Sequence, residues 1–191
     1  MTWLIAGLAL FIGSHSVRIF ADGWRTAVIA QRGEGLWKGL YSVAALAGLV
    51  MIGHGYSQMH GAAPLYTLPP HLAHATFGLV LLGFILVVAG NWPGNHIKQV
   101  VGNPMVAGVG LWALGHLLVN ATPQAVALFG AFLVWAIVAF VSLRSRPPAR
   151  PPVAPKVITT VLVVVTGTVL AGVFAHVVHV WLIGVSPFAA G

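Results

Sequence analysis

The chain has 191 residues, of which 59% are hydrophobic and only 6% are charged. A soluble domain normally carries charge on about a quarter of its residues, so a water-covered surface is excluded for most of this chain. Nine Lys and Arg against two Asp and Glu give a net charge of +7, and the sequence has no cysteine for disulfides or thiolate metal sites. The basic residues lie between apolar runs, so we expect anionic lipid headgroups and not nucleic acid as their partners.

Six apolar runs have about the 20 residues that a helix needs to cross a bilayer. They predict an all-α fold, a polytopic membrane helical bundle of about six transmembrane helices. The first run has no basic segment before it, so we expect it to remain as a span and not to be removed as a signal peptide. The fourth and fifth runs are separated by a predicted hairpin that ends at Pro123. The predicted spans are 2–20, 37–56, 72–90, 104–121, 124–143 and 157–184.

The basic residues predict the direction of the chain. All of them fall in or beside the first, third and fifth connections, and none lies in the second or fourth. Because basic connections stay in the cytoplasm, both termini are predicted outside, in the periplasm, with the protein in the cell inner membrane. The basic residues are Arg18, Arg25, Arg32, Lys38, Lys98, Arg144, Arg146, Arg150 and Lys156.

The predicted spans divide the chain into three parts. Residues 1–143 form a membrane domain of five helices. Residues 144–156 contain five prolines, which favour an extended, polyproline-like cytoplasmic linker. Residues 157–191 then supply the final transmembrane helix and a short outer tail.

Histidine is the residue type that points to chemistry inside the membrane. The chain has nine histidines, and imidazole is the natural ligand of a metal or haem iron where thiolates and carboxylates are scarce. His15, Arg18 and Asp22 share one helix face, where the last two are spaced to form an ion pair. The simpler interpretation is a hydrogen-bonded histidine beside a snorkelling arginine. His116 lies in the fourth span, beside glycines that let a helix or a flat cofactor approach.

Two further pairs of histidines have the spacing of one helix face. His71 precedes His74 by three residues, and His176 precedes His179 by the same interval. Both pairs fall near the predicted outer boundary, which makes them a second candidate metal site. The alternative is that these interfacial histidines meet only water and lipid headgroups.

Two blocks of sequence each place a histidine in a distinctive frame. The first block comprises residues 13–18 (GSHSVR) and 32–42 (RGEGLWKGLYS). The second comprises residues 103–108 (NPMVAG) and 111–120 (LWALGHLLVN). Over residues 1–143 the chain resembles the NnrU family, which is named for bacterial proteins linked to nitrite and nitric oxide reduction. That family is related to the plant zeta-carotene isomerase, a membrane enzyme that uses haem b, so the resemblance implies a haem b cofactor.

The resemblance also implies roles for individual residues. The haem ligands of the isomerase are histidines in these two blocks, and they match His15 and His116. Arg18 is then placed to neutralise haem propionates. The isomerase has a cysteine, proposed as an alternative ligand, where this chain has Ala113, and a His-Pro where this chain has Asn103-Pro104. A change of ligand from histidine to cysteine is therefore impossible in this chain.

Helix geometry sets a test for one haem shared by His15 and His116. At about 1.5 Å per residue, they lie about 8 Å and about 18 Å from the cytoplasmic ends of their spans, so they differ by roughly 10 Å in depth. Residues 10–15 also resemble residues 111–116. An inverted repeat of two halves would place the two histidines on opposite sides of the midplane with the iron between them.

Three functions remain open from the sequence. The main hypothesis is a haem b-binding membrane protein with a redox, nitric-oxide-related or isomerase-like role, the last acting on a lipid-soluble substrate. The second is a small transporter or channel that uses histidines to carry protons or metal ions. The third is a scaffold or assembly factor for a respiratory reductase. The colour of the purified protein distinguishes the first from the other two.

Overall fold

The computed structural model describes residues 1–67, 69–146 and 153–188, and these residues form helices and no strands. The predicted all-α fold is confirmed. The helices are α1 (Thr2–Phe20), α2 (Asp22–Arg32), α3 (Glu34–Ser57), α4 (Leu72–Asn91), α5 (His96–Val101), α6 (Pro104–Leu117), α7 (Pro123–Arg144), α8 (Val157–Val173), a π-helical turn (Phe174–Val178) and α9 (His179–Ile183).

Five helical stretches among the described residues are long and apolar enough to cross a membrane. They are α1, α3, α4, α7 and the continuous run Val157–Ile183. The fourth predicted span, 104–121, is shorter than expected, because α6 has only 14 residues and ends at Leu117. A helix of that length covers about 21 Å, less than the roughly 30 Å of a hydrocarbon core. The chain is therefore a multi-pass membrane protein with five full-length helices and one short one.

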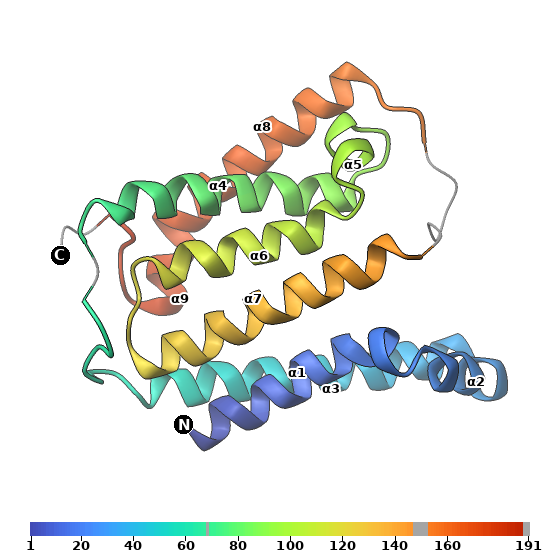
Figure 1. The fold of residues 1–191 in the computed structure, drawn as a ribbon, viewed down its shortest axis with the longest axis horizontal. Coiled ribbons are helices and arrows are strands. Elements are labelled where there is room, and N and C mark those ends of the chain that lie inside the picture. Colours follow the sequence, from blue (N-terminus) through green and yellow to red (C-terminus); the bar gives the residue numbers. More distant parts are fainter. Residues whose placement is uncertain (68, 147–152, 189–191) are drawn as a thin grey trace.

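The long helices lie side by side in the order α3, α1, α7, α6, α4 and α8 (Figure 1). In this row α7 contacts both α1 and α6, so it joins the α1–α3 pair to the group formed by α6, α4 and α8. An inverted repeat would require α1 to pack on α8 as α6 packs on α4. Among the described residues α8 packs mainly on α4 instead, so the helix order does not follow the inverted repeat.

Glycines let neighbouring helices approach to backbone contact. Between α1 and α3, a Cβ atom on Gly7 would lie 2.8 Å from the carbonyl oxygen of Gly48. Between α4 and α6, a Cβ atom on Gly83 would lie 2.9 Å from the carbonyl oxygen of Gly108. Lipid offers no hydrophobic driving force between helices, so such close packing is a main source of their association.

Two helices were not predicted from the sequence, because neither contains a span-length apolar run. The first, α2, buries no residue, and its Trp24 meets Trp37 edge-to-face at 5.6 Å between ring centroids. These features are typical of a helix that lies in the membrane interface. The second, α5, is capped by the preceding Asn95, which is 2% exposed and accepts a hydrogen bond from the backbone N–H of Lys98 at 2.7 Å.

The ion pairs lie at the end of the bundle that carries α2 and α5, which we call the basic end. Asp22 lies 4.0 Å from Arg18 and 3.6 Å from Arg25, and Glu34 lies 3.1 Å from Lys38. The N-terminal end of α1 and the final helix α9 lie at the opposite end (Figure 1). Within the described residues, the ion pairs are therefore separated from the beginning of α1 and from α9. The cytoplasmic position of the basic end stays a prediction.

The central part of the predicted proline-rich linker, residues 147–152, lies outside the described residues, as do the last three residues of the predicted outer tail. Residues 153–156 are not helical. The beginning of α8 is held to α5 by the backbone N–H of His96, which donates to Thr160 Oγ1 at 3.0 Å. The final helix is thus fixed beside α4 and α5 at the basic end.

The glycine contact between α4 and α6 predicts that Gly83→Ala destabilises the protein. The added methyl group would collide with the backbone of α6, and overpacking of this kind costs about 1–3 kcal/mol. Thermal unfolding in detergent should show a lower midpoint for Gly83→Ala. The matched control is Gly78→Ala on the same helix, where a Cβ atom meets nothing within 4 Å. Equal midpoints for the two variants would contradict the proposed role of the glycine contact.

Candidate functional site

His15 is held by α1 and by rings from two other helices. Its Nδ1 lies 2.7 Å from the carbonyl oxygen of Phe11, one turn earlier, and its ring stacks on the Phe11 ring at 4.3 Å. Tyr41 of α3 and Trp135 of α7 lie 5.1 Å and 6.0 Å away between ring centroids. A carbonyl oxygen only accepts, so Nδ1 carries the proton and donates. The lone pair of neutral His15 is therefore on Nε2, as a metal-ligating histidine requires.

His116 has the same local setting on α6. Its Nδ1 lies 2.8 Å from the carbonyl oxygen of Trp112, again one turn earlier. The Trp112 ring lies 5.2 Å away, and Phe129 of α7 stacks on the imidazole at 4.5 Å with an interplanar angle of 24°. The carbonyl again fixes the proton on Nδ1 and leaves Nε2 as the ligand atom. Both histidines therefore have the proton on Nδ1 and a free lone pair on Nε2.

Three aromatic rings, which we call the aromatic bridge, connect the two histidines. Phe11 of α1 lies 5.6 Å from Phe132 of α7, and Phe132 lies 5.6 Å from Trp112 of α6. The bridge therefore leads from the ring beneath His15 to the ring beneath His116. Both imidazoles face α7, and the space between them is occupied by aromatic side chains.

The contacts with α7 give the difference in depth between the two histidines. His15 lies beside Trp135 and His116 lies beside Phe129, six residues earlier on α7. Six residues of helix correspond to about 9 Å. This value agrees with the offset of roughly 10 Å expected from the sequence. For one iron to be shared, the two side chains must reach across this offset and Phe132 must turn away.

Trp135 supplies a polar group that has no partner in the protein. Its Nε1 is buried and has no hydrogen-bond acceptor among the described residues. Such a group costs about 1–3 kcal/mol if it stays unpaired, and it calls for an acceptor from a ligand or water. The Trp135 ring lies 6.0 Å from the His15 ring between centroids, so this unpaired donor belongs to a side chain that adjoins the candidate site.

The donor types at this site are those that a haem group uses. Two neutral imidazoles with free Nε2 atoms suit axial ligation, aromatic rings suit the faces of a flat macrocycle, and the Trp135 N–H suits a carboxylate. Arg18, one turn nearer to the basic end than His15, is 48% exposed and pairs with Asp22 at 4.0 Å, as the sequence predicted. It lies on the side where a propionate could reach it.

The four histidines of the second candidate site are at the opposite end of the bundle. His71 and His74 are exposed at the beginning of α4. His176, in the π-helical turn, stacks on Phe188 at 4.5 Å, and the Nδ1 of His179 donates to the carbonyl of Val185 at 2.7 Å. Within the described ranges, no three His, Asp or Glu side chains are grouped to hold a metal ion.

Six aromatic residues of the site were missed by the sequence reasoning: Phe11, Tyr41, Trp112, Phe129, Phe132 and Trp135. A signal for two of them was present, because Phe11 and Trp112 each precede a candidate histidine by four residues. That spacing places the ring directly beneath the imidazole on a helix face. The residue of α3 and the three residues of α7 gave no such signal, since their contacts depend on which helices become neighbours.

The fold and the site define a multi-pass helical membrane protein with two histidines anchored in an aromatic core. The chain belongs to the NnrU family, because the family model described as NnrU protein matches residues 3–187, nearly the whole chain. The match continues past residue 143 and so includes α8 and α9. No curated protein and no solved structure matches the chain.

The unpaired donor predicts that Trp135→Phe leaves the stability of the haem-free protein unchanged or slightly higher. The phenyl ring keeps most of the packing and removes an unsatisfied N–H. The contrast is Thr76→Val, which removes a hydroxyl that donates to the carbonyl of Gly115 at 2.9 Å. Because that bond is satisfied, its loss should lower stability by about 0.6 kcal/mol. Thermal unfolding in detergent compares the two, and a marked loss for Trp135→Phe would reveal an acceptor within the protein.

Proposed function

We propose that this chain is a haem b-binding membrane protein with a redox role, in which His15 and His116 are the axial ligands of one haem. The observation that carries the proposal is that the two histidines have the same hydrogen bond and the same kind of aromatic neighbour. Each donates from Nδ1 to the carbonyl four residues earlier, at 2.7 Å and 2.8 Å, and each lies over the ring of that same residue. A half-buried imidazole with this arrangement presents a basic Nε2 to a metal.

The surroundings support haem more than a single metal ion. A bare ion in protein usually takes four or more ligands, whereas haem iron needs only axial ones because the porphyrin supplies the rest. The described part of the chain groups no three His, Asp or Glu side chains, which disfavours transport of a metal ion through such a centre. The candidate ligands at this site are therefore two imidazoles that lie among aromatic rings.

The residues around the two histidines have separate roles in this proposal. The Trp135 N–H and the Arg18 guanidinium lie toward the basic end and would bind propionate oxygens. The aromatic rings exclude water and lower the local dielectric constant. When bound, haem would supply one-electron or small-molecule-binding chemistry, tuned by its axial ligands, burial and nearby charge. We place the protein in the cell inner membrane with the basic end in the cytoplasm.

The same haem would serve either of two more specific roles. One is a role in nitric oxide or nitrite metabolism, and the other is an isomerase-like reaction. The family name favours the first, and the resemblance to the zeta-carotene isomerase favours the second. Ala113 and the absence of cysteine mean that either role must proceed without a thiolate ligand. His15 and His116 would both hold the haem, which would supply electron-transfer or gas-binding chemistry when bound.

Haem ligation predicts a b-type absorption spectrum that depends on both histidines. The protein should be purified in detergent from cells supplied with a haem precursor, and spectra recorded before and after dithionite reduction. His15→Ala and His116→Ala should each lose the spectrum of a bis-histidine haem. His60→Ala, in the loop after α3, should retain it. A colourless wild-type protein from haem-replete cells would refute the proposal.

A single shared haem also predicts a stoichiometry and a role for Phe132. Wild-type protein should bind one haem per chain, and the loss of either ligand should remove it. Because Phe132 lies between Phe11 and Trp112, the rings that pack against the two imidazoles, Phe132→Leu should speed haem uptake and Phe132→Trp should slow it. Phe84→Leu is the control, since Phe84 packs on Phe174, away from the bridge. Haem titration of the apoprotein measures both quantities.

The same titration can contradict sharing. Two haems per chain, with one retained in each single histidine variant, would show that His15 and His116 serve separate sites. An uptake rate that does not respond to either change of Phe132 would show that this ring does not stand in the way.

A further inference from the structure

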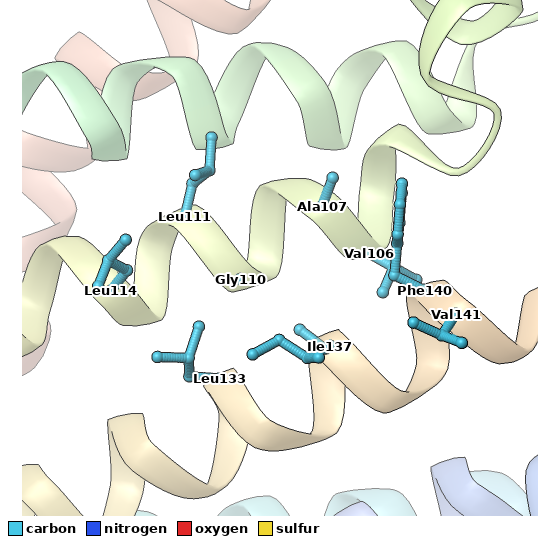
Figure 2. Close-up of a pocket in the computed structure, with 10 residues that line it drawn as sticks. Val106, Ala107, Gly110, Leu111, Leu114, Leu133, Ile137, Phe140 and Val141 are labelled. Atoms are coloured by element: carbon cyan, nitrogen blue, oxygen red, sulfur yellow. The ribbon is translucent and has the colours of Figure 1, made fainter.

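An apolar groove lies between α6 and α7 (Figure 2). Its volume is about 270 Å³, and every residue that lines it is apolar. Small residues open it, namely Ala107 and Gly110 of α6 and Ala136 of α7. Ile137 and Val141 on its rim are 56% and 65% exposed, so the groove opens toward the lipid.

The shape of the groove suits a hydrocarbon chain. It extends along α6 from Val106 to Leu114, a distance of about 12 Å for eight residues of helix. Its direction follows the helices, and lipid chains in a bilayer run in the same general direction. A groove of this kind gains van der Waals contact when an acyl chain fills it, because the lining atoms otherwise lack close partners on one side.

Two arginines stand at the basic end of this groove. Phe140 lines the groove, and the guanidinium carbon of Arg144 lies 5.5 Å from the centre of its ring. Arg146, two residues later, donates from Nη2 to the Ser142 hydroxyl at 3.0 Å. These contacts hold both guanidinium groups near the end of α7, beside the position where a chain in the groove would meet its headgroup.

The protein has no acidic side chain to neutralise these arginines. Asp22 and Glu34 are its only Asp and Glu residues. They lie on α2 and α3, where Asp22 pairs with Arg18 and Arg25, and Glu34 pairs with Lys38. Guanidinium groups at a membrane surface bind phosphate with two parallel hydrogen bonds, so a negative partner from the lipid is expected.

We propose that the groove and the two arginines form a binding site for one anionic phospholipid. One acyl chain lies in the groove between α6 and α7, and the phosphate group binds Arg144 and Arg146. A phosphatidylglycerol headgroup keeps the full negative charge of its phosphate, whereas the choline of phosphatidylcholine cancels it. The site shares no residue with His15, His116 or the aromatic bridge, so it stands independently of haem binding.

The test is a competition between two lipids with identical acyl chains. Delipidated protein in detergent receives equal amounts of phosphatidylglycerol and phosphatidylcholine, and native mass spectrometry counts the lipids retained on each chain. Wild-type protein should retain one phosphatidylglycerol in preference. Arg144→Gln should reduce this preference about fivefold, the factor for one basic residue at an anionic membrane surface. Gly110→Leu, which fills the groove, should reduce retention of both lipids.

Arg32→Gln, at the end of α2, is the matched control, and it should leave the preference unchanged. Circular dichroism checks that each variant is folded, and Ala107→Leu and Arg146→Gln replace any variant that is not. Equal retention of both lipids by the wild type, or an unchanged preference in Arg144→Gln, would overturn the proposal. So would displacement of the lipid by inorganic phosphate, which would indicate a site for the free anion. A change from dimer to monomer in Gly110→Leu with lipid retention intact would assign the groove to a second copy of the chain.

Discussion

A bilayer removes both the hydrophobic attraction between helices and the water that could satisfy a polar side chain. The rest of this structure depends on that constraint. Helices that cannot be driven together by water are instead held by backbone contact, as at Gly83 and Gly108. Histidines that cannot be hydrated are satisfied by the helix itself, through the carbonyl groups of Phe11 and Trp112. The hydrogen bond that lowers the cost of burying each imidazole also leaves its Nε2 available. The candidate ligand atoms are therefore a consequence of how the two histidines are satisfied inside the membrane.

The arrangement of helices gives α7 the central part. It contacts α1 on one side and α6 on the other, and these are the helices that carry His15 and His116. Its aromatic residues Phe129, Phe132 and Trp135 recur every three positions, so they lie along one flank of the helix. That flank sets both the separation and the depth of the histidines. Changes on α7 should therefore alter the site more than changes on α3 or α8.

The sequence predicted those parts of the protein that depend on local composition. The bounds of α1, α4 and α7 follow from runs of apolar residues, and the offset in depth between His15 and His116 follows from helix rise alone. The interfacial helix α2 and the short α5 were not predicted, because a search for apolar runs of about 20 residues does not find helices that do not cross the membrane. The aromatic bridge was not predicted either. Its contacts need the neighbour order of α1, α7 and α6, which hydropathy does not encode.

Groups that the chain leaves unpaired indicate what it binds more directly than groups that are paired. The buried Trp135 N–H lacks an acceptor beside His15, and Arg144 lies beside an apolar groove in a chain whose two acids are engaged elsewhere. Both call for an anion, but the first is buried among aromatic rings and the second is exposed at the membrane surface. In the two proposals, a haem propionate would accept from the first and a lipid phosphate would bind the second. Both proposed ligands are amphipathic anions, which suit a chain whose Lys and Arg outnumber its Asp and Glu by nine to two.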